Sequence, residues 1–268
     1  MTSATKSPNV IPQRFERPGA LRLLTTLFLV WLIVRSFQGA GVSISEIIDG
    51  IPNMGRILGE MFPPSASRLS SIGEALLVTF QMAIAGTVLG VLISLPLGIL
   101  ASRTQAPNKA AYLTSRFLVS LFRTVPDLVW ALFFVATVGL GPFAGVLTII
   151  VDTIGFCGRF FAEGIEEVDQ RPIDALKTLG ASRLSVIFAG VIPEALPSLI
   201  NSSLFSLEKA VRSSVVLGLV GAGGIGIELK VAMDIFRYSE ACTIILMIFA
   251  LVLLVEYGSS RLRKKIIN

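Results

Sequence analysis

Histidine is absent from the sequence, and cysteine occurs only twice, at Cys157 and Cys242. The lack of histidine removes the commonest metal ligand and the side chain that most often exchanges protons near neutral pH. Both cysteines lie in apolar segments, so we expect them to pack inside the protein and not to form a disulfide or a metal site. We therefore predict no metal site and no catalytic residue, and we do not expect an enzyme.

Charged residues are also scarce. They make up 15% of the chain, while 53% is hydrophobic and the mean hydropathy is +0.77; soluble domains carry about 25% charged residues. So many apolar residues cannot be hidden inside one water-soluble core of this length. No run of about ten residues alternates between polar and apolar side chains, as the strands of a membrane β-barrel do. The composition predicts an all-α, polytopic helical membrane protein.

Six apolar segments could each cross the membrane as a helix: residues 20–37, 75–102, 117–140, 143–161, 191–219 and 241–257. The parts of the chain that we expect are a cytoplasmic tail (1–19), an extra N-terminal span (20–37), an outer amphipathic segment (38–71), a core (72–260) and a basic cytoplasmic tail (261–268). A cleaved secretory signal peptide is the alternative for the first span, because basic residues precede it.

The basic residues are unevenly divided between the two sides of this arrangement. Fifteen of the 23 lysines and arginines fall on the side of the two termini, and four fall on the other side. Cytoplasmic loops carry the excess of positive charge in membrane proteins, so both termini are predicted to be cytoplasmic. This topology makes membrane lipid, and not nucleic acid, the expected partner of the net charge of +5.

The polar stretch between residues 163 and 193 is then cytoplasmic, and it contains the signals of a short helix. Pro172 suits a first helical turn, and Gly180 can adopt the left-handed conformation that ends a helix. Ser182 can cap the helix that follows. Ile173, Leu176 and Leu179 form an apolar stripe, which could fill a groove on another protein or could pack on the chain's own bundle.

This stretch resembles the EAA loop of ABC importer permeases, whose pattern is Glu-Ala-Ala, three residues, Gly, nine residues, Ile, one residue, Leu-Pro. Ala175, Gly180 and Pro193 match the pattern in register. The departures are Asp174 for Glu, Leu176 for Ala, Gly190 for Ile and Ile192 for Leu. From about residue 71 to 263 the chain is similar to the phosphonate/phosphate importer permeases, through residues 123–130, 138–145 and 216–226.

The resemblance implies a type I (MetI-like) permease fold in the bacterial inner membrane. Such permeases form a homodimer or pair with a sister permease, bind two cytoplasmic ATPase subunits, and receive cargo from an extracytoplasmic binding protein. The cargo implied is phosphonate or a related phosphorus oxyanion such as phosphate or phosphite. The residues that would couple this chain to its ATPase are Asp174, Ala175, Leu176, Lys177, Leu179 and Gly180. The sequence has no G-x-x-x-x-G-K-[ST] loop, so ATP and Mg²⁺ would belong to the partner ATPase, and this chain is expected to bind no cofactor.

Ionisable residues inside the predicted spans are candidates for a translocation path, because each costs roughly 2.5–3.5 kcal/mol to insert. The candidates are Arg123, Asp127, Lys209 and Arg212. The spacing predicts that Arg123 pairs with Asp127, and Glu208 with Arg212, along one helical face, while Asp152 stands alone. These charges could line a path for a dianion, or they could simply neutralise one another.

The glycines Gly221, Gly223, Gly224 and Gly226 satisfy the pattern G-x-G-x-x-G. Nucleotide binding through this pattern requires a βαβ unit and an acidic residue about twenty positions later. A membrane span precedes the pattern here, and residue 246 is a leucine. We therefore expect a tight backbone turn or an outer gate at the outer mouth.

Three other functions stay open on the sequence alone. The first is an importer permease for another small solute, such as methionine. The second is an ion-coupled secondary carrier, which inverted internal repeats would favour. The third is a membrane-embedded enzyme, which the missing histidine disfavours.

Overall fold

The computed structural model describes residues 19–267, and the chain divides into two units, Met1–Arg56 and Ile57–Asn268. In the first unit, α1 (Ala20–Gly39) has no buried side chain and is apolar on every side. Such a helix is stable only with lipid or another protein around it. α2 (Ile44–Met61) begins in this unit and keeps apolar residues on one face, as the predicted amphipathic segment requires.

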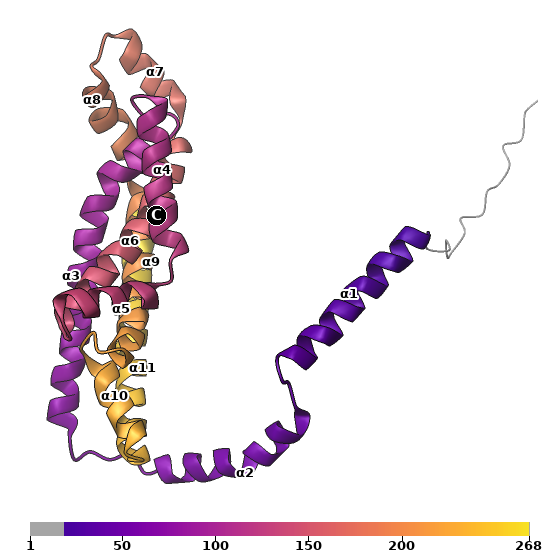
Figure 1. Cartoon of the computed structure of the whole chain (residues 1–268). Coiled ribbons are helices and arrows are strands. Elements are labelled where there is room, and N and C mark those ends of the chain that lie inside the picture. The colour runs from indigo at the N-terminus through magenta and orange to yellow at the C-terminus, as the bar shows by residue number, and fades with distance from the viewer. Residues whose placement is uncertain (1–18, 268) are drawn as a thin grey trace, which may run out of the picture. The chain divides into compact units, whose positions relative to one another are not determined.

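The second unit is a helical bundle (Figure 1). Its elements are α3 (Leu69–Ala101), α4 (Lys109–Thr124), α5 (Asp127–Val138), α6 (Pro142–Glu166), α7 (Gln170–Thr178), α8 (Arg183–Val186), the π-helical turn η1 (Ile187–Val191), α9 (Ile192–Leu219), α10 (Ile225–Asp234) and α11 (Tyr238–Ile267). Among the described residues, five helical runs are long and apolar enough to cross a membrane, and the bent pair α4–α5 can count as a sixth. Because the described residues also form no strand, the prediction of an all-α membrane protein with about six spans is confirmed.

Glycines allow α3 to lie directly against α6. A Cβ atom at Gly86 would be 2.5 Å from Ile149 Cγ2, and one at Gly90 would be 2.5 Å from Thr153 Cβ. Lipid tails are as apolar as leucine, so helices in a bilayer associate through close packing and not by escaping from water. Gly86 and Gly90 therefore form the contact that joins the two central helices.

The predicted span 117–140 is not one helix. α4 ends at Thr124, α5 starts at Asp127, and the two axes differ by 90°. Pro126 explains the break, because it disfavours helical backbone at the residue before it. A Cβ at Gly155 of α6 would be 2.7 Å from the backbone nitrogen of Arg123, so this glycine admits the end of α4.

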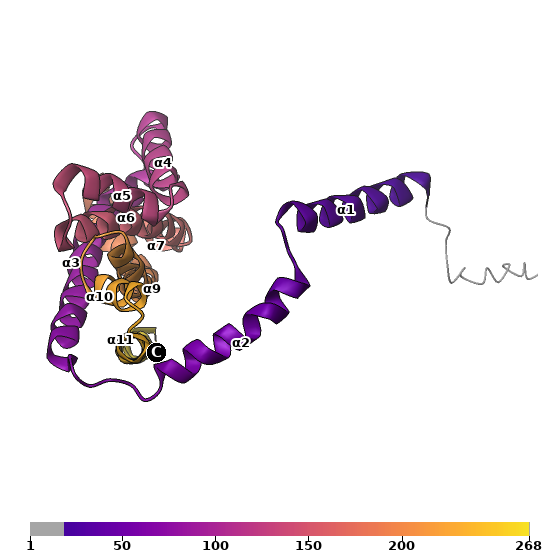
Figure 2. The same cartoon turned by 60° about the horizontal axis from the view of Figure 1, so that its bottom comes forward.

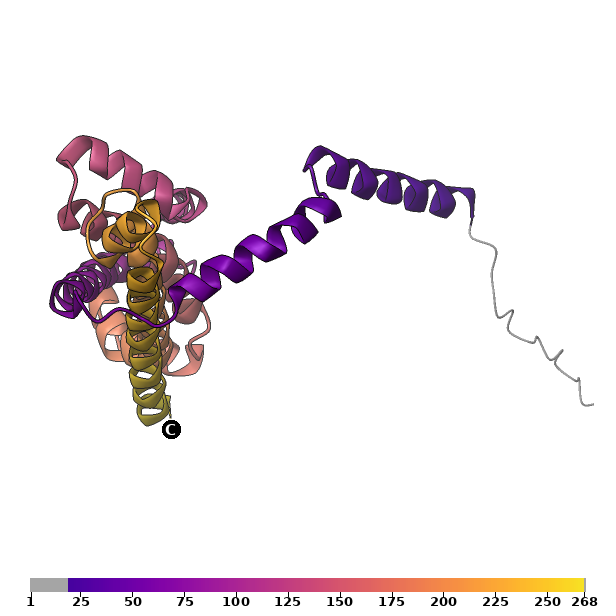
Figure 3. The same ribbon diagram turned by 90° about the horizontal axis from the view of Figure 1, so that it is seen from below.

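α7 and α8 lie at one end of the bundle and α10 at the other (Figure 1). Figure 2 turns the end that carries α10 toward the viewer. α10 packs against α3, α9 and α11, and Figure 3 looks onto this end. The last helix continues through Ile267. The segment from residue 261, which we expected to be a basic tail, therefore contributes its described residues to α11.

We expect Gly90→Ala to lower the free energy of unfolding by about 1–3 kcal/mol, because the added methyl group would overlap Thr153. Gly73→Ala is the matched control on the same helix, since nothing lies within 4 Å of a Cβ there. That substitution should be neutral or stabilising by up to about 1 kcal/mol. Denaturant unfolding in detergent, followed by circular dichroism, measures both changes. Equal stabilities would contradict the glycine contact.

Candidate functional site

The short helix predicted within residues 163–193 is α7 (Gln170–Thr178), which holds Pro172 in its first turn and is followed by Gly180 as predicted, but it begins two residues earlier, at a cap that was not predicted. The carboxylate of Asp169 accepts a hydrogen bond from the Arg171 backbone N–H at 3.0 Å and caps the start. The Arg171 guanidinium, and then this N–H, lower the pKa of Asp169 below its usual range. At the other end Gly180 has a φ of +81°, and its N–H donates to the Lys177 carbonyl at 3.0 Å. Ser182 caps α8 as predicted.

The apolar stripe of α7 is divided between two environments. Ile173 is fully buried in a core cluster with Val186 and Val191, and Leu176 packs partly against that cluster. Leu179 is 83% exposed. Ile173 and Leu176 therefore anchor the helix to its own bundle, while the docking of the exposed Leu179 in a groove of another protein stays a prediction.

Leu176 lies over Gly190 of the π-helical turn. A Cβ at Gly190 would be 3.0 Å from Leu176 Cδ1, so a larger residue at this position would have to displace the end of the Leu176 side chain. These are two of the four positions where the chain departs from the EAA pattern, with a larger residue at 176 and a smaller one at 190. The two departures compensate for each other in volume. Beside them lies a groove of about 560 Å³ lined by Ala175, Leu179, Pro193 and Glu194 among others.

Asp152 does not stand alone, which corrects the prediction. Its carboxylate lies 2.6 Å from the Lys209 ammonium and joins α6 to α9. Asp152 is 16% exposed and Lys209 is 40% exposed, so Lys209 is the more accessible partner. Lys209 also lies 5.6 Å from the ring centre of Phe156.

Glu208 pairs with Arg263 at 2.5 Å and not with Arg212, so that predicted pair was wrong. Both partners are largely buried, and the Arg263 guanidinium also lies 4.1 Å from the centre of the Phe205 ring. Sequence reasoning placed Arg263 in a solvated tail and missed this contact. The buried position of Glu208 on α9 required a cation from another helix, but spacing along one helix cannot identify it.

The predicted pair of Arg123 and Asp127 was also wrong, because the helix ends between them. Asp127 instead accepts a hydrogen bond from the Leu128 N–H at 3.0 Å, at the start of α5. Within residues 19–267, Arg123 and Arg212 are exposed and have no ion-pair partner. Arg123 lies against Gly155, one turn of α6 from Asp152, and Arg212 follows Lys209 on α9 by three residues. Three cationic side chains are thus carried by helices that meet around the middle of α6.

The predicted glycine turn connects α9 to α10 and is held by two hydrogen bonds. The Gly141 N–H donates to the Gly221 carbonyl at 3.0 Å, and the Ile225 N–H donates to Thr79 Oγ1 at 2.7 Å. Gly223 and Gly224 have φ values of +88° and +75°. A Cβ at Gly226 would overlap the Val215 carbonyl oxygen. The tight turn is confirmed, and it joins the start of α6 and the first half of α3 to the end of α9.

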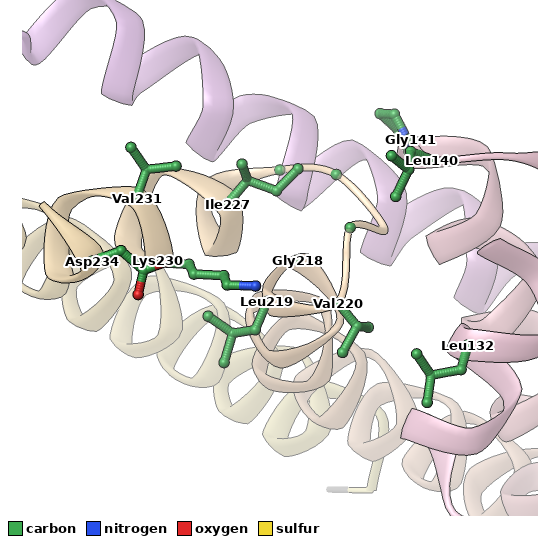
Figure 4. Close-up of a pocket in the computed structure, with 14 residues that line it drawn as sticks. Leu132, Leu140, Gly141, Gly218, Leu219, Val220, Ile227, Lys230, Val231 and Asp234 are labelled. Atoms are coloured by element: carbon green, nitrogen blue, oxygen red, sulfur yellow. The ribbon is translucent and has the colours of Figure 1, made fainter. Parts of the chain in front are cut away.

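A pocket of about 710 Å³ lies beside this turn (Figure 4). Lys230 extends from α10 across the pocket toward Gly218 and Leu219, and Asp234 lies one turn beyond it. Leu140 and Gly141 lie on the opposite side. Sequence reasoning did not select Lys230 or Asp234, because an isolated charge in a mixed loop carries no signal. In the described part of the chain, no three His, Cys, Asp or Glu residues gather where a metal could bind.

Residues 94–264 match the family model for the binding-protein-dependent transport system inner membrane component. The chain belongs to this family. Members are multi-pass inner-membrane subunits of ABC transporters, which work with an ATPase and a binding protein. The prediction of a permease subunit, and not an enzyme, is confirmed.

Two relatives and one solved structure are similar to this chain over most of its length. HtxC of Stutzerimonas stutzeri, named for phosphite transport, is 40% identical over 244 residues, which cover 91% of this chain and 86% of HtxC. The phosphate-import permease PhnE of Mycolicibacterium smegmatis is 35% identical over 81% of this chain and 41% of PhnE. An inward-facing structure of the MetNI methionine ABC transporter has a TM-score of 0.68, 25% identity, and covers 75% of this chain and 99% of that one.

We expect Gly190→Val to displace Leu176 and destabilise the anchorage of α7 by about 1–3 kcal/mol. Adding Leu176→Ala should recover part of this loss, with a coupling energy of about 0.5–3 kcal/mol. Hydrogen exchange of the α7 amides measures the local free energy of opening.

The matched control combines Gly190→Val with Leu179→Ala, a truncation of the exposed leucine on the same helix. Those two changes should add without coupling. If Leu176→Ala and Leu179→Ala show the same coupling energy with Gly190→Val, residues 176 and 190 do not compensate for each other in volume.

Proposed function

We propose that this chain forms the membrane path of an ATP-driven importer for a phosphorus oxyanion, such as phosphite, phosphate or a phosphonate. The single observation that carries the proposal is the 40% identity with HtxC over nearly the whole chain. The match to PhnE, named for phosphate import, supports the same class of cargo. Methionine is the second candidate, because the MetNI structure shares the fold, but its identity with this chain is lower.

The intramembrane charges support an anionic cargo. Arg123 and Arg212 offer two exposed cations, while Asp152 offsets the charge of Lys209. A conduit must attract an ion without trapping it, so partly compensated charge suits passage better than a tight site. In this proposal Arg123, Lys209 and Arg212 attract the oxyanion, and Asp127 and Asp152 limit its residence time.

The orientation and partners follow from α7 and from the charge distribution. Both termini and α7 are cytoplasmic in this proposal, because most basic residues then lie inside. Exposed Leu179, with Ala175 beside it, enters a groove on the ATPase, and buried Ile173 carries the movement into the bundle. Two such permease chains, identical or paired, bind two ATPase subunits. This chain binds no cofactor, and ATP and Mg²⁺ act on the ATPases.

At the outer end, the turn formed by Gly221, Gly223, Gly224 and Gly226 is proposed as the gate. It contacts α3, α6 and α9, so relative movement of these helices changes the pocket beside it. A binding protein that delivers the oxyanion docks on this side. The described residues contain no cluster able to hold a metal, and no metal has a role in the proposal.

Reconstitution in liposomes with the ATPase and binding protein of the same transport system tests the function. Loaded binding protein should stimulate ATP hydrolysis, and labelled phosphite or phosphate should accumulate only with ATP. Uptake of methionine without uptake of an oxyanion would show that the cargo is methionine and not a phosphorus oxyanion. Uptake driven by an ion gradient without ATPase would overturn the importer itself.

We expect Arg123→Ala to lower oxyanion uptake about tenfold, equivalent to roughly 1.4 kcal/mol of lost stabilisation in the path. Assembly with the ATPase should be unchanged, because Arg123 lies on α4 and the predicted contact is on α7. Arg261→Ala removes an exposed arginine on α11 and is the matched control. Normal uptake by a well-inserted Arg123→Ala protein would remove Arg123 from the path.

Variants of the Asp152–Lys209 pair can distinguish a structural role of the pair from a role in transport. Lys209→Ala alone should destabilise the protein, by up to about 3–5 kcal/mol if Asp152 stays charged, because it leaves a carboxylate without its partner. Adding Asp152→Ala should restore folding and insertion, which size-exclusion chromatography and thermal unfolding measure. In our proposal the double variant still transports poorly. Full uptake by the double variant would show that the pair only holds α6 to α9.

A further inference from the structure

A second cavity lies away from the path, at the end of the bundle that carries α8. It has a volume of about 360 Å³ and is lined by the last turns of α3, the following loop, and the start of the α8–η1 run. Its lining residues are Pro96, Ile99, Leu100, Gln105, Pro107, Arg183, Leu184, Ile187 and Phe188. We call this cavity the α3–α8 cleft. Most of its lining is apolar, and no carboxylate belongs to it.

The cleft lies where an apolar segment ends. Pro96, Ile99 and Leu100 belong to the last two turns of the membrane-spanning α3, which ends at Ala101. Leu184 and Phe188 are 67% and 64% exposed, so the cleft opens outward through large apolar side chains. The π-helical turn η1 contains Ile187 and Phe188, and such turns often mark functional sites in helices. The end of α3 places the cleft near the boundary between hydrocarbon and headgroups.

The charged residue in the lining of the cleft is a cation. Arg183 lines it and is fixed by donating a hydrogen bond to the backbone carbonyl of buried Gln105. Arg103, on the same loop, donates its backbone N–H to the Glu166 carboxylate and its side chain to Tyr112, so neither group is counted with the cleft. An apolar cleft with one guanidinium in its lining complements an acyl chain attached to a negatively charged headgroup. Basic pockets between membrane helices on the cytoplasmic side bind anionic headgroups in this way.

We propose that the α3–α8 cleft binds an anionic phospholipid, with one acyl chain among Ile99, Leu184 and Phe188 and the phosphate beside Arg183. On the proposed topology this lipid belongs to the inner leaflet. Only the choice of leaflet depends on the proposed function; the chemistry of the cleft does not. The lipid would wedge between α3 and the segment that leads from α7 into α9, so its occupancy would stiffen the base of α7.

Quenching of a single tryptophan by brominated lipid tests the proposal. Trp31 and Trp130 are replaced by phenylalanine, and Phe188→Trp places the reporter in the cleft. The protein is reconstituted in bilayers that mix ordinary lipid with brominated phosphatidylglycerol or brominated phosphatidylcholine. We expect the apparent binding constant for phosphatidylglycerol to exceed that for phosphatidylcholine about fivefold.

The control reporter is Leu254→Trp in the same background, because Leu254 is 72% exposed on α11 and lies outside the cleft. At this reporter, the ratio of the apparent binding constant for phosphatidylglycerol to that for phosphatidylcholine should be near one. Arg183→Gln should reduce the ratio at residue 188 to near one, while Arg183→Lys, which keeps the charge, should preserve it. Equal ratios at 188 and 254, or loss of the preference in Arg183→Lys, would overturn the proposal. No quenching at 188 by either lipid would mean that protein covers the cleft, which also overturns it.

Discussion

Close backbone contact between α3 and α6 is the constraint on which the rest of the bundle depends. In a bilayer there is little gain from hiding one apolar helix against another, so contact distance governs association. Gly86 and Gly90 leave no room for a side chain between the helices. Once α6 is fixed against α3, Gly155 receives the end of α4, and Asp152 faces Lys209 on α9. The charged groups are therefore positioned by residues that carry no charge.

The sequence predicted the features that depend on neighbours in the chain. Gly180 and Ser182 act within a few residues of themselves, so the end of α7 and the start of α8 were anticipated, whereas the cap at Asp169 was not. The glycine turn before α10 was predictable for the same reason. Composition was sufficient to predict a membrane protein, because the chain is too apolar for one soluble core.

The pairing of charges could not be predicted in the same way. Asp152 and Lys209 are 57 residues apart, and Glu208 and Arg263 are 55 apart. Spacing of three or four residues proposes partners on one helix, and in both proposed cases the true geometry was different. Pro126 ended the helix between Arg123 and Asp127, and α11 supplied a nearer cation for Glu208. Ion pairs between helices depend on packing that local patterns do not contain.

The division of α7 into an anchored and an exposed half also defines what could be transplanted between related permeases. Ile173 and Leu176 rest on residues of η1 and α9, and Gly190 has the size that Leu176 requires. A graft of the nine-residue helix alone would carry one half of a matched contact into a host that lacks the other half. The smallest interchangeable module is instead the continuous stretch from the cap at Asp169 to Ala195. If α7 contacts the ATPase as proposed, a graft that changes the ATPase partner would have to carry that whole module.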